Sequence, residues 1–142
     1  MTAVEALQTT LAGEHAAVYL YGALGGHTSQ AGAPALYAAL RDAYAAHRGQ
    51  RDQLTLALRD LGVDPVAAEV AYDTPVLATA SDVTTAAADL EDRCASTYAA
   101  LVAETVGDQR RWAVGALTGS AVRRTGFGAA PEAFPGAADL SS

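Results

Sequence analysis

Apolar side chains recur at steps of three and four residues along four segments of the chain, the periodicity of amphipathic helices. The spacing predicts helices over residues 3–24, 34–61, 81–106 and 109–124. The Gly25-Gly26 pair is expected to end the first helix, Pro34 suits the first turn of the second, and Ser81-Asp82 is a good cap for the third. We therefore expect an all-α protein.

The fourth helix has the weakest pattern, because it contains two glycines in its interior. Its stripe predicts four residues facing inward: Trp112, Ala116, Gly119 and Val122. Gly115 and Gly119 each cost roughly 1 kcal/mol of helix propensity relative to alanine. That cost is tolerable if the glycines let another helix approach closely.

The connections between the predicted helices are short, long and short. Short connections join antiparallel neighbours, whereas the segment 62–80 is long enough to cross the length of a bundle, so that the second and third helices run parallel. The pattern predicts an up-down-down-up, ferritin-like four-helix bundle that fills one domain, residues 1–142. The Gly- and Pro-rich tail, residues 126–142, is expected to lie across the bundle as an extended strap.

Composition agrees with close helix packing and excludes several classes of partner. Hydrophobic residues make up 51% of the 142-residue chain, about a quarter of the chain is alanine, and only 6% is aromatic. The net charge of −7 argues against nucleic acid and anionic membranes as partners. The sequence has no apolar run long enough to cross a membrane and no basic-then-apolar leader pattern, so we expect a cytoplasmic protein.

Three ionisable residues fall on or beside the apolar stripes of three different predicted helices. Glu14, His47 and Glu91 occupy roughly matching depths in the expected bundle. A buried carboxylate is costly unless it is paired, hydrogen-bonded or bound to a metal. One candidate ligand from each of three helices is the way in which a bundle builds a metal site.

Two interpretations of these residues stay open. In the first, Arg51 pairs with the carboxylates, Tyr44 and Tyr98 donate hydrogen bonds to them, and the network needs no metal. In the second, Glu14, His47 and Glu91 hold a single Fe, Mn or Zn ion. A dinuclear centre is not expected, because it needs four carboxylates and two histidines with Glu-x-x-His pairs, and the chain has none.

Two neighbouring residues add little to this set. His15 lies about 100° around the helix from Glu14, so we expect it to face outward or an interface. Cys94, the only cysteine, lies on an apolar stripe and is expected to act as a small buried hydrophobe.

Four stretches together resemble a ferritin-like family of uncharacterised proteins found mainly in actinobacteria. They are EHAAVY at 14–19, HRGQRD at 47–52, LEDR at 90–93 and AFPG at 133–136. The resemblance implies a ferritin-like bundle and a family without an assigned activity. By comparison with metal-bearing ferritins, Glu14, His47 and Glu91 match the carboxylate, histidine and carboxylate of helices one, two and three. Tyr44 replaces the helix-two glutamate, and the helix-four acid and histidine have no counterpart.

These observations favour a non-catalytic, metal-free bundle that acts as a binding or interaction module. We expect no catalytic residues, no cofactor, and a homodimer with an unknown protein or small-ligand partner. The alternative is a mononuclear metal-binding or redox protein that uses Glu14, His47 and Glu91. A weaker possibility is a pocket around Arg51 that accepts a carboxylate or phosphate from solution.

Overall fold

The computed structural model describes residues 1–137 and 140, and they form four α-helices. The helices are α1 (Ala3–Gly26), α2 (Pro34–Asp60), α3 (Ala80–Glu104) and α4 (Gly107–Gly126). The all-α, four-helix prediction is confirmed, although α1 continues through the glycine pair that was expected to end it. Among the described residues, no helix combines the length and the apolar character that a membrane span requires.

Capping side chains set the starts of α1 and α3. Thr2 accepts a hydrogen bond from the backbone N–H of Glu5, whose side chain accepts one from the Thr2 N–H, and Thr79 and Asp82 make the same reciprocal pair. The cap of α3 is therefore Thr79, two residues before the predicted Ser81. Pro34 stands at the first position of α2, as predicted.

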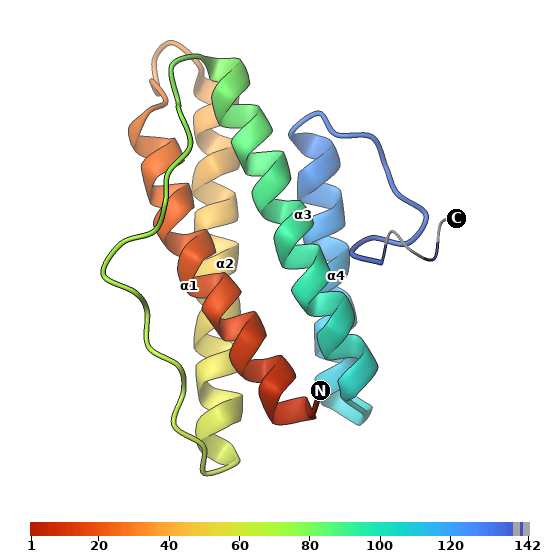
Figure 1. The fold of residues 1–142 in the computed structure, drawn as a ribbon. Coiled ribbons are helices and arrows are strands. Elements are labelled where there is room, and N and C mark those ends of the chain that lie inside the picture. The colour runs from red at the N-terminus through yellow and green to blue at the C-terminus, as the bar shows by residue number, and fades with distance from the viewer. Residues whose placement is uncertain (138–139, 141–142) are drawn as a thin grey trace.

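Figure 1 shows α1 and α4 running in one direction and α2 and α3 in the other, which is the up-down-down-up order. Close helix–helix contacts join α1 to α2, α1 to α3, and α3 to α4. The pair α2 and α4 is not among the closely packed pairs, although side chains of both helices join the same apolar cluster.

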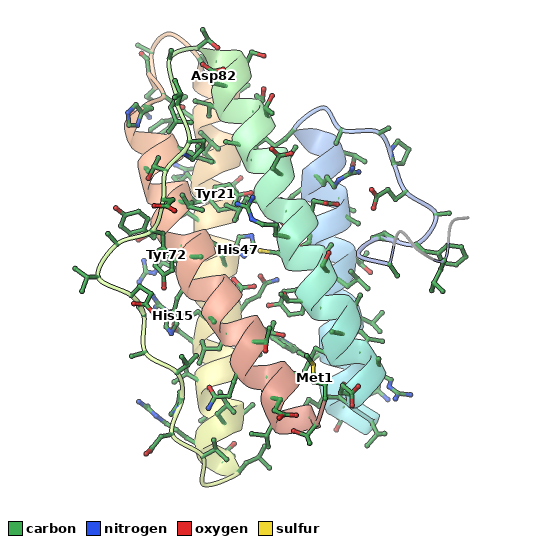
Figure 2. The ribbon with its side chains drawn as sticks, in the orientation of Figure 1. Met1, His15, Tyr21, His47, Tyr72 and Asp82 are labelled. Atoms are coloured by element: carbon green, nitrogen blue, oxygen red, sulfur yellow. The ribbon has the colours of Figure 1, made fainter. Side chains whose placement is uncertain are left out.

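The connection between α2 and α3 runs back along the length of α1, outside the bundle (Figure 1). Two side chains of α1 tie its first part down. The Gln8 amide donates to the Asp64 carbonyl at 2.8 Å and accepts from the Val66 N–H at 2.8 Å. A ring nitrogen of His15 lies 3.0 Å from the Val66 carbonyl, so His15 faces this connection (Figure 2).

The apolar core is divided into two clusters by a polar layer. The cluster nearer the α1–α2 turn includes Ala17, Tyr21, Leu24, Leu40 and Leu90. The other includes Leu7, Leu11, Leu54, Leu58 and Leu101. Along α1, Glu14 stands between the two clusters, and along α2 His47 does so.

The tail beyond α4 is held at two places in its described part. Arg124 donates to the Ala130 carbonyl at 2.6 Å and pairs with Glu132 at 3.0 Å. Further on, Gly136 lies against the backbone of α3, where a Cβ would overlap the Ala95 carbonyl and lie 2.8 Å from the Ser96 nitrogen. The predicted strap thus contacts the bundle over the described residues, whereas positions 138–139 and 141–142 of the predicted segment lie outside them.

We predict that Gly136→Ala detaches this tail. The φ of 72° at Gly136 is unfavourable for alanine by about 1–2 kcal/mol, and the overlap with α3 adds to that cost. Hydrogen exchange of residues 127–137 should become faster in the variant. Gly62→Ala is the matched control, because Gly62 has a φ of 71° but open space around it. If both variants exchange alike in the tail, the contact with α3 does not hold it.

Candidate functional site: a buried charge network

The three predicted residues Glu14, His47 and Glu91 meet in the polar layer, and each is at most 1% exposed. Glu14 comes from α1 and Glu91 from α3, and α2 places the His47 imidazole between the two carboxylates. Figure 2 shows His47 in the interior of the bundle. The Nδ1 atom of His47 lies 2.6 Å from Glu14 Oε2, and its Nε2 atom lies 2.9 Å from Glu91 Oε1.

His47 is positively charged in this setting. Both ring nitrogens face carboxylate oxygens, which only accept hydrogen bonds, so the form that donates from both nitrogens satisfies the geometry. Burial alone would lower the pKa of His47, but the hydrogen bonds and charges of Glu14 and Glu91 raise it to about 9. The Tyr21 ring stacks on the imidazole, with the ring centroids 5.2 Å apart.

Two tyrosines complete the shell around the carboxylates. Tyr98 donates to Glu14 Oε1 at 2.6 Å, and Tyr21 donates to Glu91 Oε1 at 2.5 Å. Burial, together with the nearby carboxylates, raises the pKa of both phenols well above the usual range. Both hydroxyls therefore stay protonated and act as fixed donors.

Arg123, near the end of α4, supplies the second positive charge. Its Nε donates to Glu91 Oε1 at 2.8 Å, and Nη2 lies 3.4 Å from the Ser120 hydroxyl. A Cβ at Gly119 would lie 3.2 Å from Arg123 Nη1, so this glycine leaves room for the guanidinium to lie back along α4. Burial of Glu91 acts to raise its pKa, but His47 and Arg123 hold it below the ordinary value.

The prediction that Arg51 neutralises the carboxylates is wrong. Arg51 pairs at 2.9 Å with the exposed Asp52, its own neighbour in sequence. The prediction that Tyr44 donates to a carboxylate is not borne out by the placement, because its ring lies under the Arg48 guanidinium, 5.6 Å away. Tyr21 and Arg123 make the contacts that were predicted for Tyr44 and Arg51. The residues that contact one another in this layer are called the buried network: Glu14, Tyr21, His47, Glu91, Tyr98 and Arg123.

Arg123 was missed because the last two predicted inward positions of the fourth helix, Gly119 and Val122, were each placed one residue too early. The buried residues of α4 are Ala113, Ala116 and Ser120, and continuing their spacing by three residues leads to Arg123. Val122, predicted to face inward, is 64% exposed. An error of one residue turns a helix by about 100°, enough to exchange Arg123 and Val122. Tyr21 follows Glu14 by seven residues, a spacing that puts both side chains on the same face of α1.

Cys94 lies beside the network and is buried. Ligand atoms of Glu14, His47 and Cys94 lie within 4.8 Å of one another. Burial and the two carboxylates raise the pKa of this thiol well above its usual value, which disfavours the thiolate that metals bind. The unprotonated oxygen Glu91 Oε2 is buried and has no hydrogen-bond partner among the described residues.

The structure and the site define an all-α four-helix bundle with a buried network of charged and phenolic side chains. The chain belongs to the family described as "Domain of unknown function (DUF4439)", whose model matches residues 6–139. It is also similar to the crystal structure of a conserved hypothetical protein, rv2844, from Mycobacterium tuberculosis. That likeness has 32% identity and a TM-score of 0.81, and covers 92% of this chain and 94% of the other. A comparison with curated proteins gave no match.

We predict that the stability of the fold decreases as the pH rises through the neutral range. Because folding raises the pKa of His47 from 6.5 to about 9, the folded state keeps a proton that the unfolded state loses. The stabilisation is complete below about pH 6.5 and is lost as the pH approaches 9. The unfolding free energy should decrease by about 2 kcal/mol from about pH 6.5 to about pH 8.5.

Denaturant unfolding across this range measures how the unfolding free energy changes with pH. NMR of the His47 Cε1–H reports the pKa of His47 directly. His47→Gln should remove this pH dependence, because Cys94 and the tyrosines titrate mainly above this range. A folded-state pKa for His47 near 6.5 would contradict the assignment of an imidazolium.

A second prediction distinguishes the two arginines. Arg123→Gln should lower the unfolding free energy by about 3 kcal/mol, because it leaves the buried Glu91 with one fewer charged partner. Arg51→Gln, the matched control, should cost less than about 1 kcal/mol, as expected for an exposed ion pair. Equal costs in urea unfolding would mean that Arg123 does not neutralise the buried charge.

Proposed function

We propose that this protein is a ferritin-like bundle in which protein side chains replace the metal centre, and that it acts as a non-catalytic binding or interaction module. The observation that carries the proposal is the set of donors on Glu91 Oε1. Tyr21, His47 and Arg123 all converge on this one oxygen, at 2.5, 2.9 and 2.8 Å. Two carboxylates, one imidazolium and one guanidinium have formal charges that sum to zero, so no further cation is needed.

The residues present do not fit a dinuclear metal site. Such a site takes four carboxylates and two histidines from four helices. The buried layer contributes Glu14, Glu91 and His47, and three residues before His47 stands Tyr44. Helix α4 contributes an arginine instead of an acid or a histidine. We therefore derive no ferroxidase, oxygenase or storage chemistry from this layer.

A single metal ion is the second candidate, and two observations favour it. The ligand atoms of Glu14, His47 and Cys94 lie close enough together to share an ion, and Glu91 Oε2 has no donor among the described residues. A carboxylate, an imidazole and a thiolate suit zinc best, whereas the ligand set Glu14, His47 and Glu91 suits iron or manganese as well. Either set requires His47 to lose a proton and one of its two carboxylate hydrogen bonds.

Elemental analysis of untagged protein, purified without chelators, tests the proposal. We expect less than about a tenth of an ion per chain after incubation with iron, manganese or zinc, and no rise in the melting temperature. Arg123→Met is the informative comparison, because it removes the competing cation while leaving both carboxylates in place. A metal-dependent rise in melting temperature in this variant alone would indicate that the Arg123 guanidinium takes the place of a metal ion.

About one ion per chain in the unaltered protein would overturn the metal-free proposal. Loss of that ion in His47→Gln would then assign the mononuclear site. Loss in Cys94→Ser as well would select the ligand set with Cys94, and retention there would select the set with Glu91. The homodimer stays a prediction, and sedimentation equilibrium on the same samples measures it.

A further inference from the structure

We propose that the cavity between α2 and α4 binds a small monocarboxylate with an apolar body, whose carboxylate is held by the terminal nitrogens of Arg123. This assignment gives a ligand class to the binding module proposed above and rests on that proposal. The cavity has a volume of about 420 Å³. That size is within the usual range for small-molecule sites, which are mainly apolar and have few polar groups.

The packing of the helices explains why a cavity exists here. Helix α2 packs on α1 and α4 packs on α3, whereas α2 and α4 are not closely packed on each other. Small residues face the gap from α2, Ala39 and Ala43, and Val122 faces it from α4. Phe127, just beyond α4, also lines the cavity, and its ring lies 6.3 Å from the Tyr21 ring, measured between centroids.

Arg123 is the one cationic side chain that lines this cavity, and it is already fixed in place. Its Nε donates to Glu91. The guanidinium can lie along α4 because Gly119 has no side chain at that point. Nη2 makes only a long contact of 3.4 Å with Ser120, and Nη1 has no hydrogen bond within the described part of the chain. A guanidinium has five N–H donors in a rigid fork, so one edge can serve Glu91 while the terminal nitrogens bind a second carboxylate.

The charges around the cavity favour a single negative charge on the ligand. Two carboxylates on one guanidinium are tolerable here because His47, which lies against the same Glu91 oxygen as Arg123, carries a further positive charge. Asp42 also lines the cavity, and its side chain is exposed. A second carboxylate on the ligand would be repelled by Asp42, whereas apolar atoms would pack on the two alanines, Val122 and Phe127. Phosphate fits less well, because it has no apolar part to fill the walls.

The sequence predicted an anion pocket around Arg51. The structure places Arg51 beside Asp52 at the surface, so that pocket is not the one proposed here. The present site instead combines the cavity with Arg123 of α4, a residue that the predicted inward stripe of the fourth helix did not include.

Isothermal titration with benzoate and octanoate tests the proposal. We expect one site per chain with a dissociation constant below about 1 mM for at least one probe, and at least about tenfold weaker binding of benzamide and of terephthalate. Asp42→Asn should reduce the discrimination against terephthalate. Binding should also shift the NMR signals of Tyr21, whose ring lies beside Phe127 of the cavity wall.

Val122→Trp should abolish binding by filling the cavity from an exposed position of α4. Val114→Trp is the matched control, because Val114 is also exposed on α4 but does not line the cavity. Arg123→Lys, which keeps the charge but not the fork, should weaken binding at least about tenfold.

Three results would overturn the proposal: no binding of either acid, equal binding of benzamide, or binding that Val122→Trp leaves intact. These outcomes are separable from failure of the metal-free proposal, which is decided by the metal content of the same sample. A metal-free protein that binds neither acid would leave the bundle assignment standing and remove only this ligand.

Discussion

The interior of this protein depends on one imidazole that bridges two buried carboxylates. A carboxylate transferred into a dry core costs several kcal/mol unless opposite charge and hydrogen bonds compensate it. His47 compensates both Glu14 and Glu91, because each of its nitrogens faces one of them. The remaining groups add what the imidazole cannot supply: Tyr98 donates to Glu14, while Tyr21 and Arg123 donate to Glu91.

This requirement also fixes how the helices are arranged. The network takes one glutamate from α1, one from α3, the histidine from α2 and the arginine from α4, so all four helices must have the correct depth and rotation for the charges to be satisfied. Apolar side chains above and below the layer can repack with small losses, whereas a half-satisfied polar layer is strongly destabilising. The polar layer therefore selects one register of the bundle, and the two apolar clusters provide most of the burial.

The same arrangement connects the interior to the surface. Arg123 has one edge on Glu91 and lines the cavity between α2 and α4, and Phe127 contacts both that cavity and Tyr21. A ligand in the cavity would thus contact the outer members of a network whose inner members are fully buried. The inner groups are enclosed by their own partners, whereas Arg123 keeps part of its side chain exposed.

The helical periodicity of the sequence by itself determined the four helices, the length of the α2–α3 connection and the inward placement of Glu14, His47, Glu91 and Tyr98. These features follow from local spacing, since residues three and four apart share a helix face. Only the tertiary structure decided which arginine neutralises the layer. Arg51 and Arg123 both lie on helices next to buried positions, and their long side chains can turn either inward or to solvent. The choice depends on how far each helix is rotated about its axis, on Gly119 leaving space for the guanidinium and on Asp52 offering Arg51 a partner in water. Spacing along the chain does not contain these distances, because they arise when separate helices pack together.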